Sequence, residues 1–210
     1  FGDTNSGSLD DTFIIKYNPD GTNDWEQYLD LTEDGWAEAI TIGSGGYIYL
    51  VGVTDGDPLT ESTDNDDAFV SKYNPNGTKI WTQLIGGSAS EYGNSIVIGE
   101  DNSIYITGTT YSDIVDGQIS NGLGDVFITK LNSHGIKQWT ILSGSLGNEY
   151  GNGISIDSDN NIYITGTTNG NLDGQINHGS DDGFISKFSS NGTKLWTKLV
   201  GSSTYDRSND

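Results

Sequence analysis

Aspartate residues recur at one phase of this sequence and could offer oxygen ligands to a cation. Each of four Asp residues stands two positions before a Phe, and in three cases a second Asp directly precedes it. Calcium takes roughly six to eight oxygen ligands, which closely spaced carboxylates and the carbonyls of glycine-rich loops can supply. We therefore expect calcium at some of these residues: Asp10, Asp11, Asp66, Asp67, Asp125, Asp181 and Asp182.

A simpler alternative is that these carboxylates cap turns by accepting backbone N–H groups where a strand begins. Two similar segments, Asp116–Ile119 and Asp173–Ile176, read Asp-Gly-Gln-Ile and lie in the same polar links. Residues 157–161 alternate like a calcium loop but lack the Gly and the distal Glu of an EF-hand. Calcium binding and turn capping are both open on this pattern.

Catalysis needs side chains that converge at one site, and the sequence offers no such set. The chain has no Cys, and its two His residues, His134 and His178, fall in turns or loops. No Gly-x-Ser-x-Gly nucleophile motif occurs. We expect a protein that is not an enzyme; the alternative, a fragment of a hydrolase, rests on carboxylate pairs that so acidic a chain can form.

The elements that would position these residues repeat along the chain. Trp25, Trp81, Trp139 and Trp196 follow one another at intervals of 56, 58 and 57 residues, and the Phe and Lys residues keep the same intervals. Fixed periods of this length indicate one structural unit repeated several times. We expect each Trp to pack between neighbouring units.

Each unit divides into four short strand-like runs bounded by Gly, Asn and Asp. In one unit these runs are 94–98, 103–109, 126–131 and 137–142, and a longer polar link separates the second run from the third. Four antiparallel strands per unit of about 57 residues predict an all-β fold, a β-propeller with three complete blades and a half blade. The expected boundaries are 1–30 for the partial blade, 31–86, 87–144 and 145–201 for blades, and 202–210 for the start of a further unit.

The repeated motifs resemble the bacterial beta-propeller repeat called SBBP. The resemblance is carried by GNGISIDSDNNIYITGTT from Gly151, DDAFVSKYNPNGTKIW from Asp66 and GDVFITKLNSHGIKQW from Gly124, and it extends over essentially the whole chain. The segment WAEAITIGSGG from Trp36 departs from the pattern. The resemblance implies a part of a large secreted or surface-attached bacterial protein, and it implies no catalytic motif.

Charge and hydropathy restrict the partners of this chain. It carries 30 acidic and 9 basic residues, a net charge of −21, which argues against nucleic acid and anionic membranes as partners. No apolar run approaches the roughly 18 residues that a membrane span needs. We therefore expect no membrane insertion, and the resemblance to SBBP repeats implies a location outside the cell or on its surface.

The phases of the two ends predict incomplete units, because both ends lack the same pair of strands. An unpaired strand edge invites association, so we expect other copies of the chain, or the rest of a longer chain, to supply the missing strands. The expected function is a non-catalytic structural or adhesive role, in a fibre or a surface layer. The alternative is a module that binds surface glycans or proteins.

Overall fold

The computed structural model describes residues 13–28, 35–54 and 65–208, and these form antiparallel β-sheets with one short 3-10 turn, η1 (Ser44–Gly46). A hairpin of β1 (Phe13–Tyr17) and β2 (Asn23–Tyr28) comes first. Three four-stranded sheets follow. Their strands are β3 (Gly35–Ile42), β4 (Ile48–Thr54), β5 (Asp67–Tyr73) and β6 (Lys79–Ile85); β7 (Glu91–Ile98), β8 (Ile104–Thr110), β11 (Asp125–Leu131) and β12 (Lys137–Ser143); and β13 (Glu149–Ile156), β14 (Ile162–Thr168), β15 (Asp182–Phe188) and β16 (Lys194–Val200).

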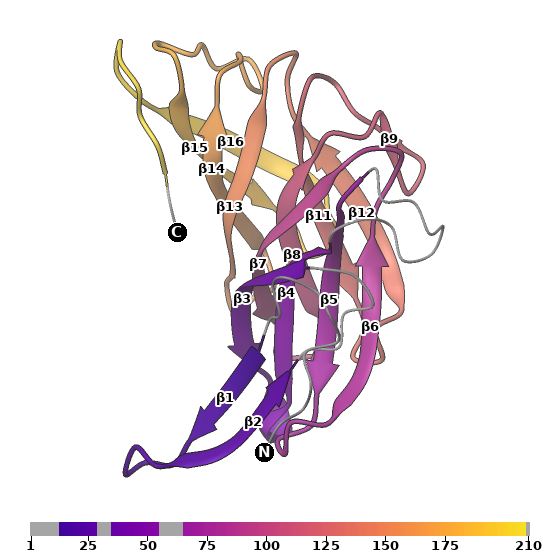
Figure 1. Cartoon of the computed structure of the whole chain (residues 1–210). Helices are drawn as coiled ribbons and strands as arrows, with labels where there is room; N and C mark the ends of the chain where they lie inside the picture. Colours follow the sequence, from indigo (N-terminus) through magenta and orange to yellow (C-terminus); the bar gives the residue numbers. More distant parts are fainter. Residues whose placement is uncertain (1–12, 29–34, 55–64, 209–210) are drawn as a thin grey trace.

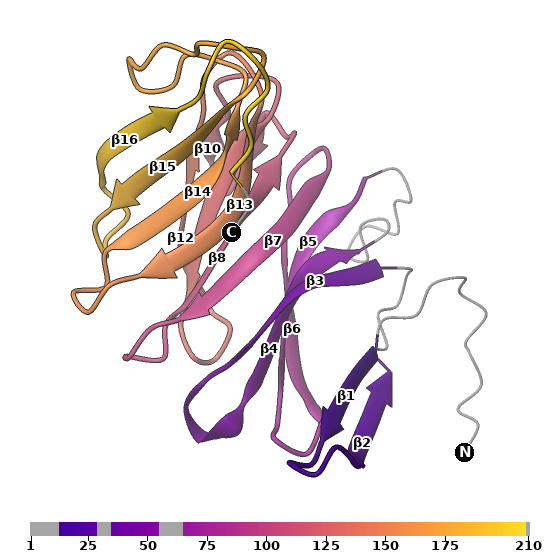
Figure 2. The same cartoon turned by 90° about the vertical axis from the view of Figure 1, so that its left-hand side faces the viewer.

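The sheets stack on one another with the same strand order. In each sheet the first strand forms one edge and the fourth forms the other, and the first strands β3, β7 and β13 lie side by side (Figures 1 and 2). Each first strand contains a β-bulge at the same position, and the bulged residues are Glu38, Asn94 and Asn152. The Nδ2 group of Asn94 donates to the carbonyl of Gly151 at 2.8 Å, and that of Asn152 donates to the carbonyl of Ser208 at 2.6 Å. In β7 and β13 the bulge therefore aims an amide at the next unit.

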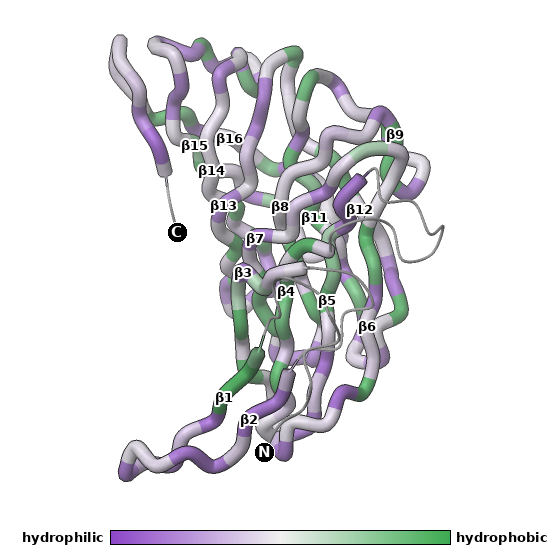
Figure 3. The backbone as a smooth tube through the Cα atoms, in the orientation of Figure 1, coloured by the Kyte–Doolittle hydropathy of each residue, from purple (hydrophilic) through white to green (hydrophobic). Residues whose placement is uncertain are grey.

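Apolar side chains fill the spaces between neighbouring sheets. In β5, Phe69 and Tyr73 pack with Ile14 of the β1–β2 hairpin, whereas Val70 on the opposite face packs with Ile106 of the following sheet. A strand that is covered on both faces buries both of its side-chain rows, as in a stacked repeat. Apolar residues lie along β1, whereas the turn between β1 and β2 is hydrophilic (Figure 3).

The repeated tryptophans join the units as predicted. A methyl group placed on Gly77 would come within 3.0 Å of the Trp25 ring, one on Gly135 within 2.9 Å of the Trp81 ring, and one on Gly192 within 3.7 Å of the Trp139 ring. These three glycines have φ between 80° and 86°, so they also provide the positive φ of the hairpin turn. Each of the three Trp rings therefore covers the turn of the next unit.

The prediction of an all-β, antiparallel repeat fold is confirmed over the described residues. No sheet closes on itself within the described ranges, and the number of blades in a complete ring stays a prediction. Among the described residues no helix is long and apolar enough to cross a membrane.

Candidate functional site

The Asp residues singled out by the sequence lie where the third strand of each sheet begins. Asp67, Asp125 and Asp182 are the first residues of β5, β11 and β15, and each is buried. Asp66 and Asp181 precede two of them, whereas Asp10 and Asp11 lie outside the described residues.

Two of these buried carboxylates cap the loop that precedes their strand. Oδ2 of Asp125 accepts the backbone N–H of Asn121 at 2.8 Å, and Oδ2 of Asp182 accepts the N–H of His178 at 3.0 Å. In both cases the donor stands four residues before the Asp. These bonds match the turn-capping alternative.

The other oxygen of each of these carboxylates faces a glycine. Oδ1 of Asp125 and Oδ1 of Asp182 are buried without a hydrogen-bond donor among the described residues. A methyl group on Gly144 would lie 1.9 Å from the first oxygen, and one on Gly201 would lie 2.1 Å from the second. Glycine therefore lets the backbone of the following loop approach the carboxylate closely.

A second set of repeated acids was missed by the sequence analysis. Glu91 and Glu149 open the first strands β7 and β13, are fully buried, and accept hydrogen bonds of 2.5 Å from Thr110 and Thr168. Glu149 also accepts the N–H of Ser145 at 2.6 Å and its hydroxyl at 2.7 Å. Asp206 makes the corresponding bonds to Ser202 at 2.7 and 2.8 Å. The signal was available, because these acids keep the repeat interval.

The buried acids of neighbouring units affect one another electrostatically. Burial raises the pKa of Asp125, and the negative charge of Glu149 raises it further. Burial also raises the pKa of Glu91, against the lowering effect of its hydrogen bonds from Ser112 and Thr110. The strand register places Thr110 between Glu91 and Asp125, and Thr168 between Glu149 and Asp182, so a row of acids and threonines runs across the ends of these strands.

Among the described residues, this row contains no group of three or more His, Cys, Asp or Glu side chains placed to share a metal ion. The calcium prediction for Asp66, Asp67, Asp125, Asp181 and Asp182 gains no support from this geometry.

The segment that resembles a calcium loop forms a hairpin turn. The carboxylate of Asp157 accepts the backbone N–H groups of Asp159 at 3.0 Å and of Asn161 at 2.8 Å, together with the Asn161 amide at 2.9 Å. These bonds, first of all the one from the Asn161 side chain, lower the pKa of Asp157. The carboxylate organises the turn with its own neighbours.

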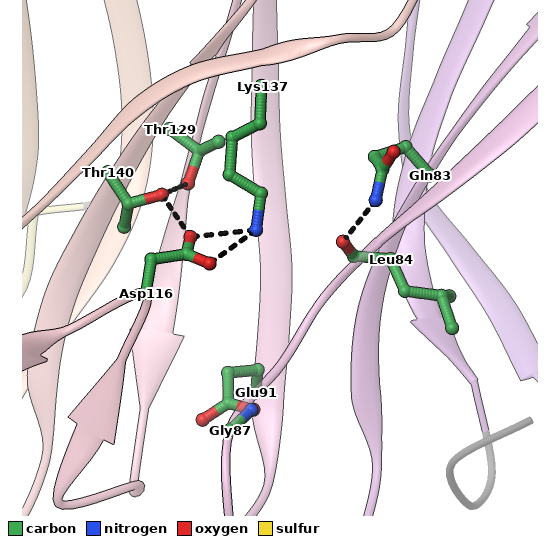
Figure 4. A network of polar contacts seen from close by, with 8 residues as sticks. All are labelled: Gln83, Leu84, Gly87, Glu91, Asp116, Thr129, Lys137 and Thr140. Atoms are coloured by element: carbon green, nitrogen blue, oxygen red, sulfur yellow. Dashed lines mark hydrogen bonds and ion pairs between the residues drawn. The ribbon is translucent and has the colours of Figure 1, made fainter. Parts of the chain in front are cut away.

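The two Asp-Gly-Gln-Ile segments anchor the long link to the outer strand of the same sheet. Asp116 accepts two hydrogen bonds from Lys137 Nζ, at 2.6 and 2.8 Å, and one from the Thr140 hydroxyl at 2.6 Å (Figure 4). Asp173 makes the same contacts with Lys194, at 2.8 Å to each oxygen, and with Thr197. In the first case the turn joins two short strands, β9 (Ile114–Val115) and β10 (Gln118–Ile119).

One cavity has a volume of about 370 Å³ and lies beside β13 and β14. Its lining residues are Tyr150, Asn152, Thr167, Asn169, Asp181, Tyr205 and Arg207.

We call this cavity the Asn169 cavity, after one of its lining residues. In the preceding unit the same position is Tyr111, whose ring lies 6.1 Å from that of Tyr92 in an edge-on contact. The hydroxyl of Thr167 in the wall of the cavity is buried without a hydrogen-bond partner among the described residues.

Sheets of four antiparallel strands, stacked through the same tryptophan, glycine and asparagine contacts, define a propeller-like repeat protein. Residues 138–173 match the model of the family SBBP, described as a beta-propeller repeat, so the resemblance noted from the sequence motifs is confirmed over that segment.

Two curated proteins are similar over most of this chain. An uncharacterized WD repeat-containing protein, L264, of Acanthamoeba polyphaga mimivirus is 26% identical over 95% of the chain. The regulatory protein FlaEY of Caulobacter vibrioides is 24% identical over 80% of it. The chain spans only 19% and 20% of the lengths of these two relatives.

A solved structure supports the fold. The crystal structure of a protein of unknown function from Bacteroides caccae superposes with a TM-score of 0.54 at 13% sequence identity. The match covers 90% of this chain and 55% of that one, and at this identity it concerns the fold alone.

Proposed function

We propose that this chain is a non-catalytic β-propeller segment with a structural or adhesive role outside the cell or on its surface. In this proposal residues 31–86, 87–144 and 145–201 are complete blades and residues 1–30 belong to a half blade. The observation that carries it is the repetition of one interface: the contact of a tryptophan with the glycine of the next turn occurs three times. A repeated contact between units serves assembly rather than one reacting centre.

The high negative charge suits a protein whose surface is exposed to water and dissolved ions. With a net charge of −21, the chain repels nucleic acids and anionic membranes and stays dispersed at low ionic strength. Many of the repeated acids have contacts described above. These acids cap loops, anchor links or organise turns, so most of their hydrogen bonds and ion pairs are made within the repeat.

Protease treatment of intact cells tests the proposed location. We call the polypeptide that contains this sequence the parent protein. We expect that protease added outside the cells that make it degrades the parent protein, as followed with an antibody against this chain. A cytosolic enzyme monitored in the same samples must stay intact. Recovery of undegraded parent protein together with that enzyme in the cell interior would contradict the proposal.

The Asn169 cavity favours a second candidate function, the binding of a glycan. Two tyrosines, Tyr150 and Tyr205, with the side chains of Asp181 and Arg207, combine aromatic and polar groups in one wall, as sugar recognition requires. A glycan array probed with this chain is then expected to show one sugar class bound reproducibly. The Asn169→Tyr variant, which restores the residue of the preceding unit, is expected to lose that binding; equal binding by both proteins would exclude the cavity.

A further inference from the structure

Neighbouring units are joined by a contact between a tryptophan and the turn glycine of the next unit. At one end of the stack the tryptophan of this contact is exposed, and at the other end the glycine is exposed. Hairpin β1–β2 and strand β16 lie at opposite ends of the molecule (Figures 1 and 2). Trp196 is 40% exposed, whereas Trp25, Trp81 and Trp139 are half-buried against the turns of the following units. At the other end, no described atom comes within 4 Å of a methyl group placed on Gly21. Trp196 and Gly21 thus stand at the positions of a contact that the chain makes three times elsewhere.

Apolar residues near Gly21 are also exposed, although the equivalent residues of the next unit are buried. Phe13 and Tyr17 are 57% and 59% exposed, although Phe69 and Tyr73, which hold the same positions in the next unit, are 0% and 1% exposed. We call the surface of Phe13, Tyr17 and the turn Asn18–Gly21 the leading face.

The surface of β16 at the other end is the counterpart. We call the surface formed by Trp196, Lys198 and Val200 the trailing face; these residues alternate along β16 and therefore share one side of it. Val200 is 70% exposed, whereas Ile85 at the equivalent position is fully buried.

Charge distinguishes this pair of faces from the internal interfaces. In the second four-stranded sheet, Ile141 of β12 lies beside the turn of the following sheet, with its Cγ2 3.5 Å from a methyl group placed on Gly192. Lys198 holds the position of Ile141 in the last unit.

The residue before the turn glycine is acidic only at the first turn. It is Asp20 in the first unit, but Asn76, His134 and Asn191 in the others. Hydrogen bonds from Thr22 lower the pKa of Asp20, so its carboxylate is charged at neutral pH. The leading face therefore carries an acidic residue, Asp20, and the trailing face carries a basic residue, Lys198.

We propose that the trailing face of one copy of this chain docks on the leading face of a second copy, with Trp196 on Gly21 and Lys198 beside Asp20. The inference rests on the proposed structural role and names the partner as a second copy. Such an interface is heterologous, so a docked copy still offers a free leading or trailing face, and growth continues until the assembly closes or remains an open chain.

Sedimentation velocity of the 210-residue chain measures this association directly. In 150 mM NaCl, which shortens the Debye length to about 8 Å and so screens the mutual repulsion of two acidic copies, we expect the weight-average sedimentation coefficient to rise with concentration. Trp196→Ala is expected to weaken the association at least about tenfold. Leu195→Ala removes an exposed apolar side chain from the other side of the same strand and is expected to change it little. A monomer at every concentration up to about 1 mM, a range in which even weak contacts are populated, would overturn the proposal.

Disulfide trapping tests which faces meet, and the absence of native cysteine makes it unambiguous. A mixture of Asp20→Cys and Lys198→Cys copies is expected to form a covalent heterodimer under mild oxidation. A copy carrying both substitutions is expected to form a ladder of larger species or a closed ring. If each single variant instead dimerised with itself as readily as the mixture, head-to-tail docking would be excluded.

These outcomes can be separated from failure of the proposed function. A monomeric chain whose parent is degraded on intact cells would overturn the docking and leave the surface role standing. Head-to-tail dimers of a protein confined to the cell interior would support the docking and contradict the surface role.

Discussion

Replacing Gly108 with alanine is expected to lower the free energy of unfolding by about 3 kcal/mol, because the new methyl group has no space. It would lie 1.8 Å from the backbone oxygen of Tyr92 and 2.8 Å from the Phe127 ring. Gly108 is paired with Gly93 of β7 on one side and with Phe127 of β11 on the other, so neither neighbour can move without breaking the sheet. For a chain of this size, the loss corresponds to a fall of about 10 °C in the melting temperature.

Circular dichroism during a thermal melt measures this effect, and Gly117→Ala is the matched control. Gly117 has a φ of 77°, but no described atom lies within 4 Å of its added methyl group. Its substitution therefore reports backbone strain without a collision and is expected to cost about 1 kcal/mol. Equal melting temperatures for the two variants would show that the space around Gly108 is not limiting.

The same close approach of a second-strand glycine to the neighbouring backbone recurs in each four-stranded sheet. It explains why glycine repeats at this position. A methyl group on Gly52 would lie 2.1 Å from the oxygen of Trp36, and one on Gly166 would lie 2.1 Å from the oxygen of Tyr150. The ring of the third-strand Phe packs on this glycine in each sheet, at 2.9 Å for Phe69 and 2.5 Å for Phe184 from the added methyl. The glycine of the second strand and the Phe of the third strand therefore pack directly against each other in each sheet.

The strands could be predicted from the sequence because their signal repeats. The run predicted at 126–131 corresponds to β11, and the run at 137–142 corresponds to β12. The first strand was predicted to begin at residue 94, but β7 begins at Glu91, because the β-bulge at Asn94 interrupts the alternation of side chains. The short strands β9 and β10 were missed, because two residues are too few to show a period.

The candidate site was only partly predictable. The phase of Asp125 and Asp182 located the strand starts, and turn capping was one of two open interpretations of it. Buried Glu91 and Glu149 were missed because a carboxylate is expected at the surface unless its partners are known, and their Thr partners lie on the neighbouring strands β8 and β14. The Asn169 cavity is lined by residues that lie far apart in the sequence, from Tyr150 to Arg207, and a repeat pattern does not show that they come together.

Replacing Glu149 with alanine is expected to destabilise the fold by about 3 kcal/mol, because it leaves buried donors without an acceptor. The N–H and hydroxyl of Ser145 and the hydroxyl of Thr168 all donate to this carboxylate, which is fully buried. Water cannot easily replace it at such a site. Urea denaturation measures the loss, and hydrogen exchange is expected to show the Ser145 amide exchanging faster than in the unmodified protein.

Asp206 provides the control, because it makes the same type of contact at a less buried place. Its carboxylate accepts the N–H and hydroxyl of Ser202, which is exposed, so water can satisfy these donors when Asp206 is replaced with alanine. The expected cost there is about 1 kcal/mol or less. Burial, and not the number of hydrogen bonds alone, should therefore separate the two variants. Equal losses would mean that the acids of the row act independently of the packing between units, and the account of the row as a buried junction would then be wrong.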